Sequence, residues 1–291
     1  MNKKSVTLSN KETIYYLEEG LHHQETIILV HGNMSSSVHY LPIIKPLSEK
    51  FHVIALDLRG FGDSTYHKPI QSLEDFADDI YSFLKVLKRD KIILVGWSAG
   101  GGVSLKFAAK YPNMIKKLIL IESASIKGYP IFKKDEKYQP ILTEIYQTKE
   151  EMAKDPVQVL PVQMALKNQD SAFMKRIWEA AIYNTKIPEN IDLYISESLK
   201  QRNLIDLDWA LMTFNISSEH NGVVDGDNTV DNILCPVLAI YGLKDLAVPK
   251  YMFDETVKAL KNVKTHLFDE GSHSPITDYP EELAKLIVEF I

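Results

Sequence analysis

The chain has 291 residues, with 33 Lys and Arg against 39 Asp and Glu, which gives a formal net charge of −6. This balance argues against a general nucleic-acid-binding protein, because such a protein needs a net basic face. No apolar run approaches the ~18 residues of a membrane-spanning helix, and the single cysteine, Cys235, excludes an internal disulfide. We therefore expect a soluble, cytoplasmic, globular protein with neither a nucleic-acid nor a membrane partner.

Short apolar runs rich in β-branched residues recur four times before residue 122. Near-continuous apolar strands are typical of a parallel sheet that is covered on both faces. The four runs that we assign to strands are Ile27–His31, Val53–Asp57, Ile92–Gly96 and Leu118–Ile121. Because longer segments with helical signals separate them, the pattern predicts repeated βαβ units and an α/β fold.

The clearest helix signal runs from Leu73 to Leu87. Its apolar residues recur at spacings of three, four and seven, which places them on one face of a helix. Ser72 precedes this segment as the predicted N-cap, and Asp75 stands at the capping-box position. The segment is therefore predicted to be an amphipathic helix that begins directly after Ser72.

The pattern changes between about Ser123 and Asn232. Strand-like runs disappear there, and several short helices are indicated by segments rich in Glu, Lys, Leu, Met and aromatic residues. We expect residues 123–232 to form a helical cap, inserted after the strand that ends near Glu122. Residues 1–122 and 233–291 are expected to form one core domain, a mostly parallel sheet with helices on both faces.

The last part of the chain returns to the first pattern. It predicts a strand at Pro236–Tyr241, a helix at Met252–Leu260, a strand at Lys264–Phe268 and a closing helix at Glu281–Phe290. These elements complete the sheet-and-helix arrangement of the core.

A Gly-x-Ser-x-Gly sequence, Gly96-Trp97-Ser98-Ala99-Gly100, lies between an apolar strand and a helix that begins near Ala99. A serine on such a sharp strand-to-helix turn is held in a strained backbone conformation that exposes its Oγ, and small flanking residues avoid clashes. The following helix N-terminus favours negative charge on an oxyanion. A phosphate-binding loop is the alternative, but the dinucleotide pattern needs glycine at Ser98 and no Gly-Lys-Ser/Thr follows.

Five motifs follow one another along the chain: His31-Gly32-Asn33, Asp-x-Arg-Gly-x-Gly-x-Ser at 57–64, the serine turn, Tyr241-Gly242-Leu243-Lys244-Asp245 and Gly271-Ser272-His273. Together they resemble the α/β-hydrolase fold superfamily, in the order that is typical of it, and the resemblance covers nearly the whole chain. It implies a serine hydrolase with a helical cap.

The resemblance implies a catalytic triad of Ser98, Asp245 and His273, and their order along the chain is also that of the family. Glu122, at the end of the strand before the insertion, is the competitor for the role of the acid. The predicted oxyanion hole consists of the backbone N–H of Ala99 and that of Asn33, with Met34 as the alternative second donor.

The remaining motif residues are interpreted as structural. His31 is expected to position its own loop, and the aspartates and arginine of 57–64 are expected to support the loops around the site. No His-x-x-x-His spacing indicates a zinc site, so we predict neither a metal ion nor a cofactor.

The serine at position 98 argues against the haloalkane dehalogenases and epoxide hydrolases of this fold, which use an aspartate, although His31-Gly32-Asn33 is similar to the dehalogenase loop. The aromatic and methionine residues of the insertion favour a pocket for an apolar group. We therefore expect an acyl-enzyme on Ser98 and a small, mainly apolar carboxylic ester or lactone as the substrate. A carbon–carbon bond hydrolase or amidase with the same triad, and a ligand-sensing protein with slow turnover, remain as alternatives.

Overall fold

The computed structural model describes residues 2–291. Its centre is an eight-stranded sheet in the order β1-β2-β4-β3-β5-β6-β9-β10. β1 pairs with β2 and β2 with β4 in antiparallel register, and all further neighbours are parallel. The strands are β1 (Lys4–Thr7), β2 (Thr13–Glu19), β3 (Thr26–Val30), β4 (His52–Leu56), β5 (Ile92–Trp97), β6 (Ile115–Ile121), β9 (Val237–Gly242) and β10 (Val263–Phe268).

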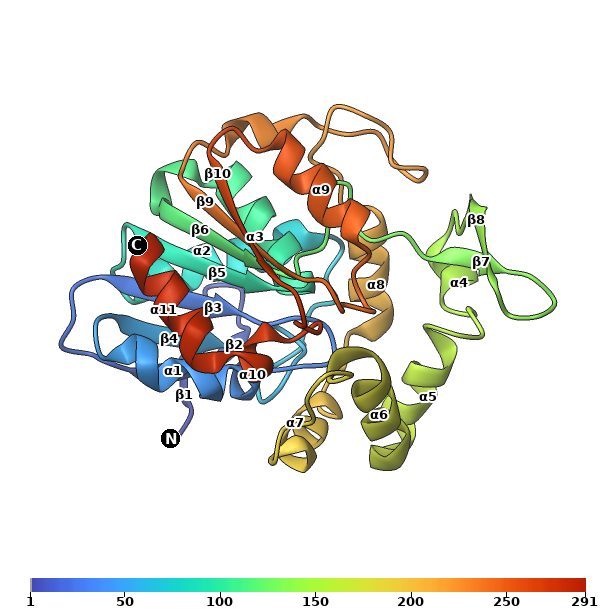
Figure 1. Cartoon of the computed structure of the whole chain (residues 1–291), viewed down its shortest axis with the longest axis horizontal. Helices are drawn as coiled ribbons and strands as arrows, with labels where there is room; N and C mark the ends of the chain where they lie inside the picture. The colour runs from blue at the N-terminus through green and yellow to red at the C-terminus, as the bar shows by residue number, and fades with distance from the viewer. Residues whose placement is uncertain (1) are drawn as a thin grey trace.

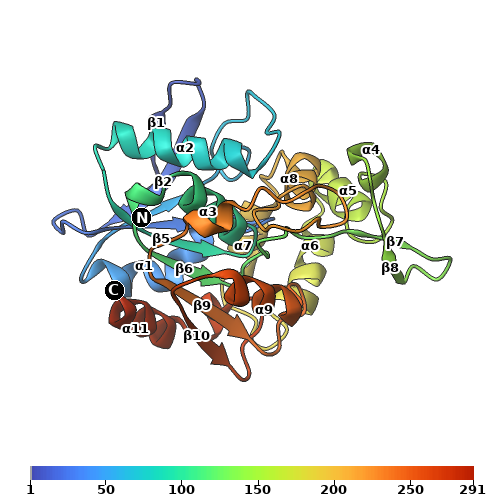
Figure 2. The same cartoon turned by 90° about the horizontal axis from the view of Figure 1, so that it is seen from above.

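Helices cover both faces of this sheet (Figure 1, Figure 2). Helices α2 (Leu73–Val86) and α3 (Ala99–Lys110) pack together over one face, and α1 (Leu41–Ser48) and α11 (Pro280–Phe290) over the other. Helix α9 (Lys250–Ala259) connects β9 with β10, and the short helix α10 (Pro275–Asp278) lies between β10 and α11. The mostly parallel α/β sheet with helices on both faces is therefore confirmed.

The hydrophobic core consists of two layers, because alternate strand residues point to opposite faces. In β3, Ile28 and Val30 join the buried cluster beneath α2 and α3, whereas Ile27 and Leu29 join the cluster beneath α1 and α11. All four side chains are fully buried. This two-sided burial explains why the central strands have near-continuous apolar sequences.

The predicted strands of the core are present to within a few residues, and the predicted helix after Ser72 begins and ends almost as expected. The Ser72 side chain accepts a hydrogen bond from a first-turn N–H, and the Asp75 carboxylate accepts one from the N–H of Ser72, so the capping box is confirmed. Two strands before Ile27 and helix α1 were not predicted.

The segment between β6 and β9, which we call the insertion, contains the expected short helices, α4 (Lys149–Met152), α5 (Leu160–Asn168), α6 (Ser171–Ile177), α7 (Ile191–Ser198) and α8 (Leu204–Met212). The expectation that strands disappear here is wrong, because β7 (Phe132–Lys134) and β8 (Pro140–Ile145) form an antiparallel hairpin. In both views this hairpin and α4–α7 extend from one end of the sheet (Figure 1, Figure 2).

The end of the insertion packs beneath α2 and α3, whereas side chains of α5, α6 and α7 belong to the buried cluster beneath α1 and α11. Phe214, Ile216 and Val230 are buried in the same cluster as α2 and α3. The boundary that we expected at residue 232 therefore marks a change in the sequence pattern. The residues just before it are packed in the same buried cluster as α2 and α3.

One lysine links three segments of the molecule. The Lys3 ammonium lies 2.7 Å from Asp57, 2.9 Å from Asp63 and 3.0 Å from Glu197. Asp57 and Asp63 belong to the loop after β4, whereas Glu197 belongs to α7 of the insertion. Burial alone would lower the pKa of Lys3, but the three carboxylates raise it, so the side chain stays charged.

Main-chain and amide contacts also fasten the insertion to the core. The N–H of Arg202 donates to the carbonyl of Gly60 (2.8 Å), and the Asn203 side chain donates to the carbonyl of Arg59 (2.8 Å). Both acceptors are backbone carbonyls of the loop after β4, in which Gly60 has a left-handed conformation. These two hydrogen bonds hold the segment between α7 and α8 against the core.

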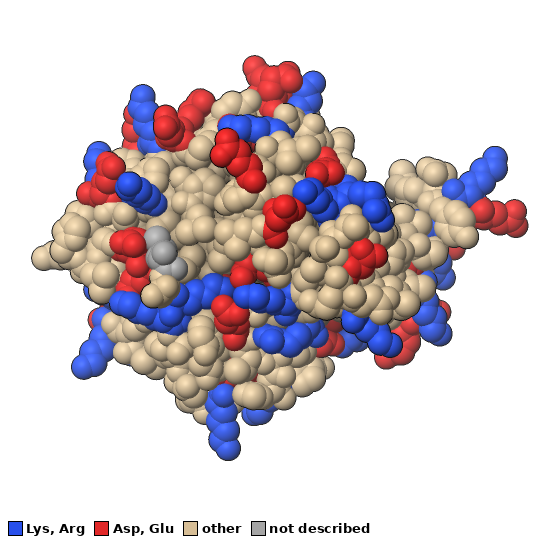
Figure 3. Space-filling model, turned by 90° about the horizontal axis from the view of Figure 1, so that it is seen from below, with Lys and Arg blue, Asp and Glu red and all other residues tan. Residues whose placement is uncertain are grey.

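No described helix between residues 2 and 291 is long and apolar enough to cross a membrane. On the face that Figure 3 shows, a band of basic side chains crosses the middle of the molecule, with acidic side chains beside it.

Replacing Ser72 with alanine removes the side-chain acceptor at the start of α2. We expect Ser72→Ala to lower the free energy of unfolding by about 1 kcal/mol, measured by urea denaturation. Ser82→Ala, in the same helix but away from its end, is the matched control. It should change stability by only a few tenths of a kcal/mol and in the favourable direction, and equal losses in both variants would exclude the capping explanation.

Candidate active site

Ser98 lies on the turn between β5 and α3 with φ 55° and ψ −124°. This left-handed backbone conformation is rare for a residue with a Cβ. It is held from both sides, because the Ser98 N–H donates to the carbonyl of Ile121 (2.9 Å) and the Ser98 carbonyl accepts from Gly101 (2.9 Å) and Ala124 (3.1 Å). The sequence-based expectation of a strained strand-to-helix turn at this serine matches the backbone described here.

The flanking glycines are required by close approaches of the backbone. A Cβ on Gly100 would overlap the carbonyl oxygens of Val30 and His31 from the neighbouring strand β3. A Cβ on Gly96 would lie 2.5 Å from the carbonyl oxygen of Gly100, which is too close for any side chain. The Gly-x-Ser-x-Gly spacing therefore lets α3 begin in contact with β3, directly below Ser98.

His273 and Asp245 form a buried pair. Their Nδ1 and Oδ2 atoms are 2.8 Å apart, and the exposed fractions of the two side chains are 3% and 0%. The other carboxylate oxygen of Asp245 accepts hydrogen bonds from the N–H groups of Ala247 (2.7 Å) and Val248 (3.0 Å). Burial alone would raise the pKa of Asp245, but the His273 imidazole and these hydrogen bonds hold it below its usual value.

The loop that carries His273 is fixed by its neighbours. The indole N–H of Trp97, next to Ser98 in the chain, donates to the carbonyl of His273 (2.8 Å). The N–H and hydroxyl of Ser272 both donate to one oxygen of Asp278 in α10 (2.7 and 2.6 Å). Ser98 and His273 line the same cavity.

Glu122, the competitor for the acid, lies beside Asp245 rather than in its place. One of its oxygens accepts from the N–H of Gly242, and the other is buried without a hydrogen-bond donor. Burial first, and then the neighbouring Asp245 carboxylate, raise the pKa of Glu122 far above its usual value. A neutral Glu122 that donates its proton to Asp245 satisfies the second oxygen and avoids two adjacent negative charges.

The two proposed oxyanion donors, the backbone N–H groups of Asn33 and Ala99, belong to residues that line the Ser98 cavity. Among residues 2–291 neither N–H donates to an internal acceptor. The N–H of Met34, in contrast, donates to the side-chain oxygens of Asn33 (2.9 Å) and Gln201 (2.9 Å). This difference favours Asn33 over Met34 as the second donor.

The Asn33 side chain is occupied elsewhere. Its oxygen accepts from Gln201 (2.8 Å), and its amide N–H donates to Asp208 of α8 (3.1 Å). Only the backbone of Asn33 is therefore free to bind an oxyanion, and its side chain connects the loop after β3 with the insertion.

His31 and the 57–64 block have the structural contacts that we expected. The ring of His31 accepts from the N–H of Leu58 (3.0 Å) at Nε2 and donates to the carbonyl of Gly32 (2.8 Å) at Nδ1. Complete burial lowers the pKa of His31 to about 4, so the ring is neutral. Arg59 binds both carboxylate oxygens of Asp79 in α2 (2.7 Å each).

The cavity around Ser98 and His273 has a volume of about 340 Å³ and lies between the core and the insertion. Of the aromatic and methionine residues of the insertion, only Tyr129 and Trp178 line it. The expected apolar pocket is therefore present, and branched aliphatic residues contribute more of its lining than aromatic and methionine residues do. The branched aliphatic residues include Ile131, Val162, Ile177, Ile182, Leu211 and Val248.

Sequence reasoning missed Asp208, a carboxylic acid in the wall of this cavity. The residue is 7% exposed, and its burial raises the pKa to about 7. The available signal was a pair of acids, Asp206 and Asp208, within the otherwise apolar sequence of Leu204–Met212. Gln201 was missed as well, because nothing in its surroundings in the sequence distinguishes it from a surface residue.

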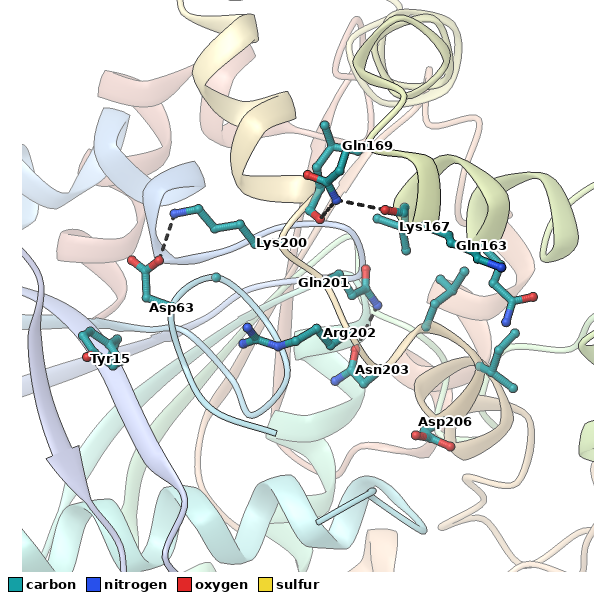
Figure 4. Close-up of a pocket in the computed structure, with 15 residues that line it drawn as sticks. Tyr15, Asp63, Gln163, Lys167, Gln169, Lys200, Gln201, Arg202, Asn203 and Asp206 are labelled. Carbon is teal, nitrogen blue, oxygen red and sulfur yellow. Dashed lines mark hydrogen bonds and ion pairs between the residues drawn. The ribbon is translucent and has the colours of Figure 1, made fainter. Parts of the chain in front are cut away.

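A larger hollow of about 860 Å³ lies between the insertion and the loop after β4 (Figure 4). It shares Leu204 with the first cavity but contains neither Ser98 nor His273. Several of its polar side chains bind one another, including Lys200 with Asp63 (2.9 Å) and Gln201 with Asn203 (3.0 Å). The Lys200–Asp63 contact holds the insertion on the core. Since Ser98 and His273 line only the smaller cavity, the candidate chemistry belongs there.

Glu122, Asp245 and His273 are the one group in residues 2–291 whose potential metal ligands lie within 4.8 Å of one another. Hydrogen bonds among these residues and to Gly242 already account for the arrangement. The prediction that the site uses no metal ion remains a prediction.

The comparisons agree with this architecture. Residues 25–279 match the family described as alpha/beta hydrolase fold, and the chain therefore belongs to this family, as its motifs led us to expect. The human serine hydrolase BPHL is 27% identical over 285 residues, which cover 93% of this chain and 82% of that protein.

Among solved structures, an esterase from Exiguobacterium antarcticum has a TM-score of 0.75 and 19% identity. An enol-lactonase from Burkholderia xenovorans LB400 has a TM-score of 0.75 and 17% identity. Each match covers 99% of both chains. At these identities the similarity shows the fold.

The raised pKa of Asp208 predicts how stability depends on pH. An unfolded aspartate ionises near pH 4, whereas folded Asp208 keeps its proton to about pH 7. The contribution of Asp208 to the free energy of unfolding therefore falls as the pH rises from about 4 to about 7, and it is constant above pH 7. Asp208→Asn keeps an acceptor for Asn33 but cannot ionise. The stability of the variant relative to the wild type should rise by on the order of 2 kcal/mol between pH 5 and pH 8, measured by urea denaturation. A difference that is independent of pH would contradict the assigned burial effect.

Proposed function

We propose that the protein is a serine hydrolase that cleaves a small, mainly apolar carboxylic ester or lactone through an acyl-enzyme on Ser98. The observation that carries this proposal is a largely apolar cavity that is lined by a strained serine, Ser98, and by His273, whose imidazole pairs with the buried Asp245. The volume of this cavity lies at the lower end of the usual range for small-molecule sites.

In the proposed mechanism, the Oγ of Ser98 attacks the substrate carbonyl while Nε2 of His273 accepts the hydroxyl proton. Asp245 accepts the hydrogen bond from Nδ1–H, which selects the required tautomer and stabilises the imidazolium that forms. His273 then donates the proton to the leaving alkoxide. In the second half-reaction His273 activates a water molecule, which attacks the acyl-enzyme and releases the acid.

The developing oxyanion accepts hydrogen bonds from the N–H groups of Ala99 and Asn33 in this mechanism. Each such donor contributes on the order of 10²–10³ in rate when it is already positioned. Ala99 is the first residue of α3, so the positive end of the helix dipole adds to the stabilisation. No step requires a cofactor.

The choice of an ester or lactone rests on the lining and on the relatives. Branched aliphatic side chains surround Ser98, and no lysine or arginine lines the cavity that the described residues form. This lining suits an uncharged acyl chain better than a phosphate or a coenzyme A moiety. The names of the similar structures, an esterase and an enol-lactonase, are consistent with carboxylic-ester chemistry.

Hydrolysis of p-nitrophenyl esters from acetate to laurate tests the proposed function. We expect sustained turnover with a chain-length optimum set by the small cavity, and a loss of about 10⁶ in kcat for Ser98→Ala. Substantial hydrolysis by the folded Ser98→Ala variant would place the chemistry elsewhere. A burst of one product per protein followed by near silence would instead favour the ligand-sensing alternative.

The roles of Asp245 and Glu122 can be separated with two isosteric amides. Asp245→Asn should reduce the Ser98-dependent activity by roughly 10⁴, because it favours the wrong tautomer of His273. Glu122→Gln should retain activity within a few-fold, because an amide N–H can replace the proposed carboxyl proton. Glu122→Ala provides no such donor and should be less active than Glu122→Gln. If Glu122→Gln were the most damaging of the three, Glu122 would be the acid. The readout is kcat/KM on the best p-nitrophenyl ester.

A further inference from the structure

Asp208 has no counter-ion among the residues that the structure describes, 2–291. No lysine, arginine or histidine nitrogen among residues 2–291 lies within 4.0 Å of its carboxylate. One of its oxygens accepts a single hydrogen bond, from the Asn33 amide (3.1 Å), and the other accepts none from the described chain. Buried acids are normally paired, because desolvation of an isolated charge is costly. A partner for this carboxylate is therefore expected to come from outside the chain.

The position of Asp208 is in the reaction cavity itself. Its side chain lines the same cavity as Ser98 and His273. It also contacts the side chain of Asn33, whose backbone N–H is a proposed oxyanion donor. A group bound at Asp208 therefore lies in the same cavity as the substrate carbonyl that Ser98 is proposed to attack, with Asn33 in contact with Asp208.

The rest of the lining limits what that group can be. The carboxylate of Asp208 is the one acidic side chain of the cavity, and no basic lysine or arginine lines it. Tyr129 and Trp178 contribute aromatic surfaces to the same cavity, and such surfaces also attract cations. An anionic substrate group would be repelled here, whereas an ammonium group would find its only opposite charge.

We propose that the substrate is an ester or lactone that carries a protonated amine a few bonds from its carbonyl, and that the Asp208 carboxylate binds this ammonium group. The proposal rests on the proposed hydrolase function and specifies its substrate class. The ammonium N–H donates to the free carboxylate oxygen, the Asn33 amide remains on the other, and the apolar walls hold the hydrocarbon part.

Two pairs of esters test the proposal, because the members of each pair differ only in a protonated nitrogen. Ethyl 3-(dimethylamino)propanoate and ethyl 4-methylpentanoate place this difference on the acyl side. 2-(Dimethylamino)ethyl acetate and 3-methylbutyl acetate place it on the alcohol side. Hydrolysis is followed by proton release at about pH 8, above the pKa of about 7 at which Asp208 ionises, with Ser98→Ala as the blank.

We expect the wild type to prefer the amine ester in at least one pair. Asp208→Asn should reduce kcat/KM for that amine ester by roughly 10- to 100-fold, the usual effect of losing a charge-assisted hydrogen bond. Its hydrocarbon twin should change by less than a few-fold. Asp206→Asn, two residues earlier in α8, removes a carboxylate that pairs with Lys149 outside this cavity and should leave the preference unchanged.

Two results would overturn the proposal. One is the absence of any preference for the amine esters in the wild type. The other is an equal loss on both members of a pair in Asp208→Asn, which would mean that Asp208 acts only by holding Asn33.

A binding measurement separates this proposal from the proposed hydrolase function. Trp97 and Trp178 line the cavity, so their fluorescence can report binding of the same four esters to Ser98→Ala, which cannot turn them over. Tighter binding of the amine ester, lost in the Ser98→Ala, Asp208→Asn double variant, supports the ammonium site even if none of the esters is hydrolysed. Equal binding of both members of each pair contradicts the ammonium site even if the hydrocarbon esters are hydrolysed.

Discussion

The close packing of α3 against β3 is the constraint on which the site depends. Glycine at 100 lets the backbone of α3 touch the end of β3, and glycine at 96 lets it touch β5. Between these two contacts Ser98 has a left-handed conformation at the end of β5. The position of Ser98, the N-terminus of α3 and the loop after β3 are thereby set by one piece of backbone geometry. An added methyl group at either glycine would displace all three together, because nothing flexible lies between them.

The carboxyl ends of the parallel strands supply the other parts. Asp245 follows β9 and His273 follows β10, so neighbouring strands bring together residues that are far apart in the sequence, as is typical of open α/β sheets. The insertion lines part of the cavity, and both apolar packing and polar contacts attach it to the core. Gln201 and Asp208 bind the side chain of Asn33, so the segment that shapes the substrate cavity also positions a residue of the proposed oxyanion hole.

The core could be predicted well from the sequence because its signals are local and strong. Continuous β-branched runs identify buried parallel strands, and Ser72 with Asp75 identifies a helix start. The hairpin β7–β8 could not be predicted in the same way, because its strands are half exposed and carry lysine and glutamate among few apolar residues.

The lining of the cavity could not be predicted from the sequence either. Which face of a short insertion helix points to Ser98 depends on its docking against the core, and no residue pattern within the helix encodes that. Asp208 illustrates the difficulty, since an aspartate in a helix is usually solvated, and only the tertiary contacts with Asn33 show that this one is buried.

The ion-pair cluster at Lys3 has a practical consequence for handling the protein. Its single ammonium joins the amino-terminal segment, the loop that carries Asp57 and helix α7 of the insertion, and only 12% of the side chain is accessible. A fusion partner or affinity tag placed immediately before this residue would therefore disturb a contact with helix α7 of the insertion, although Glu197 lies 194 residues further along the chain. Tags at the carboxyl terminus, beyond α11, avoid this cluster.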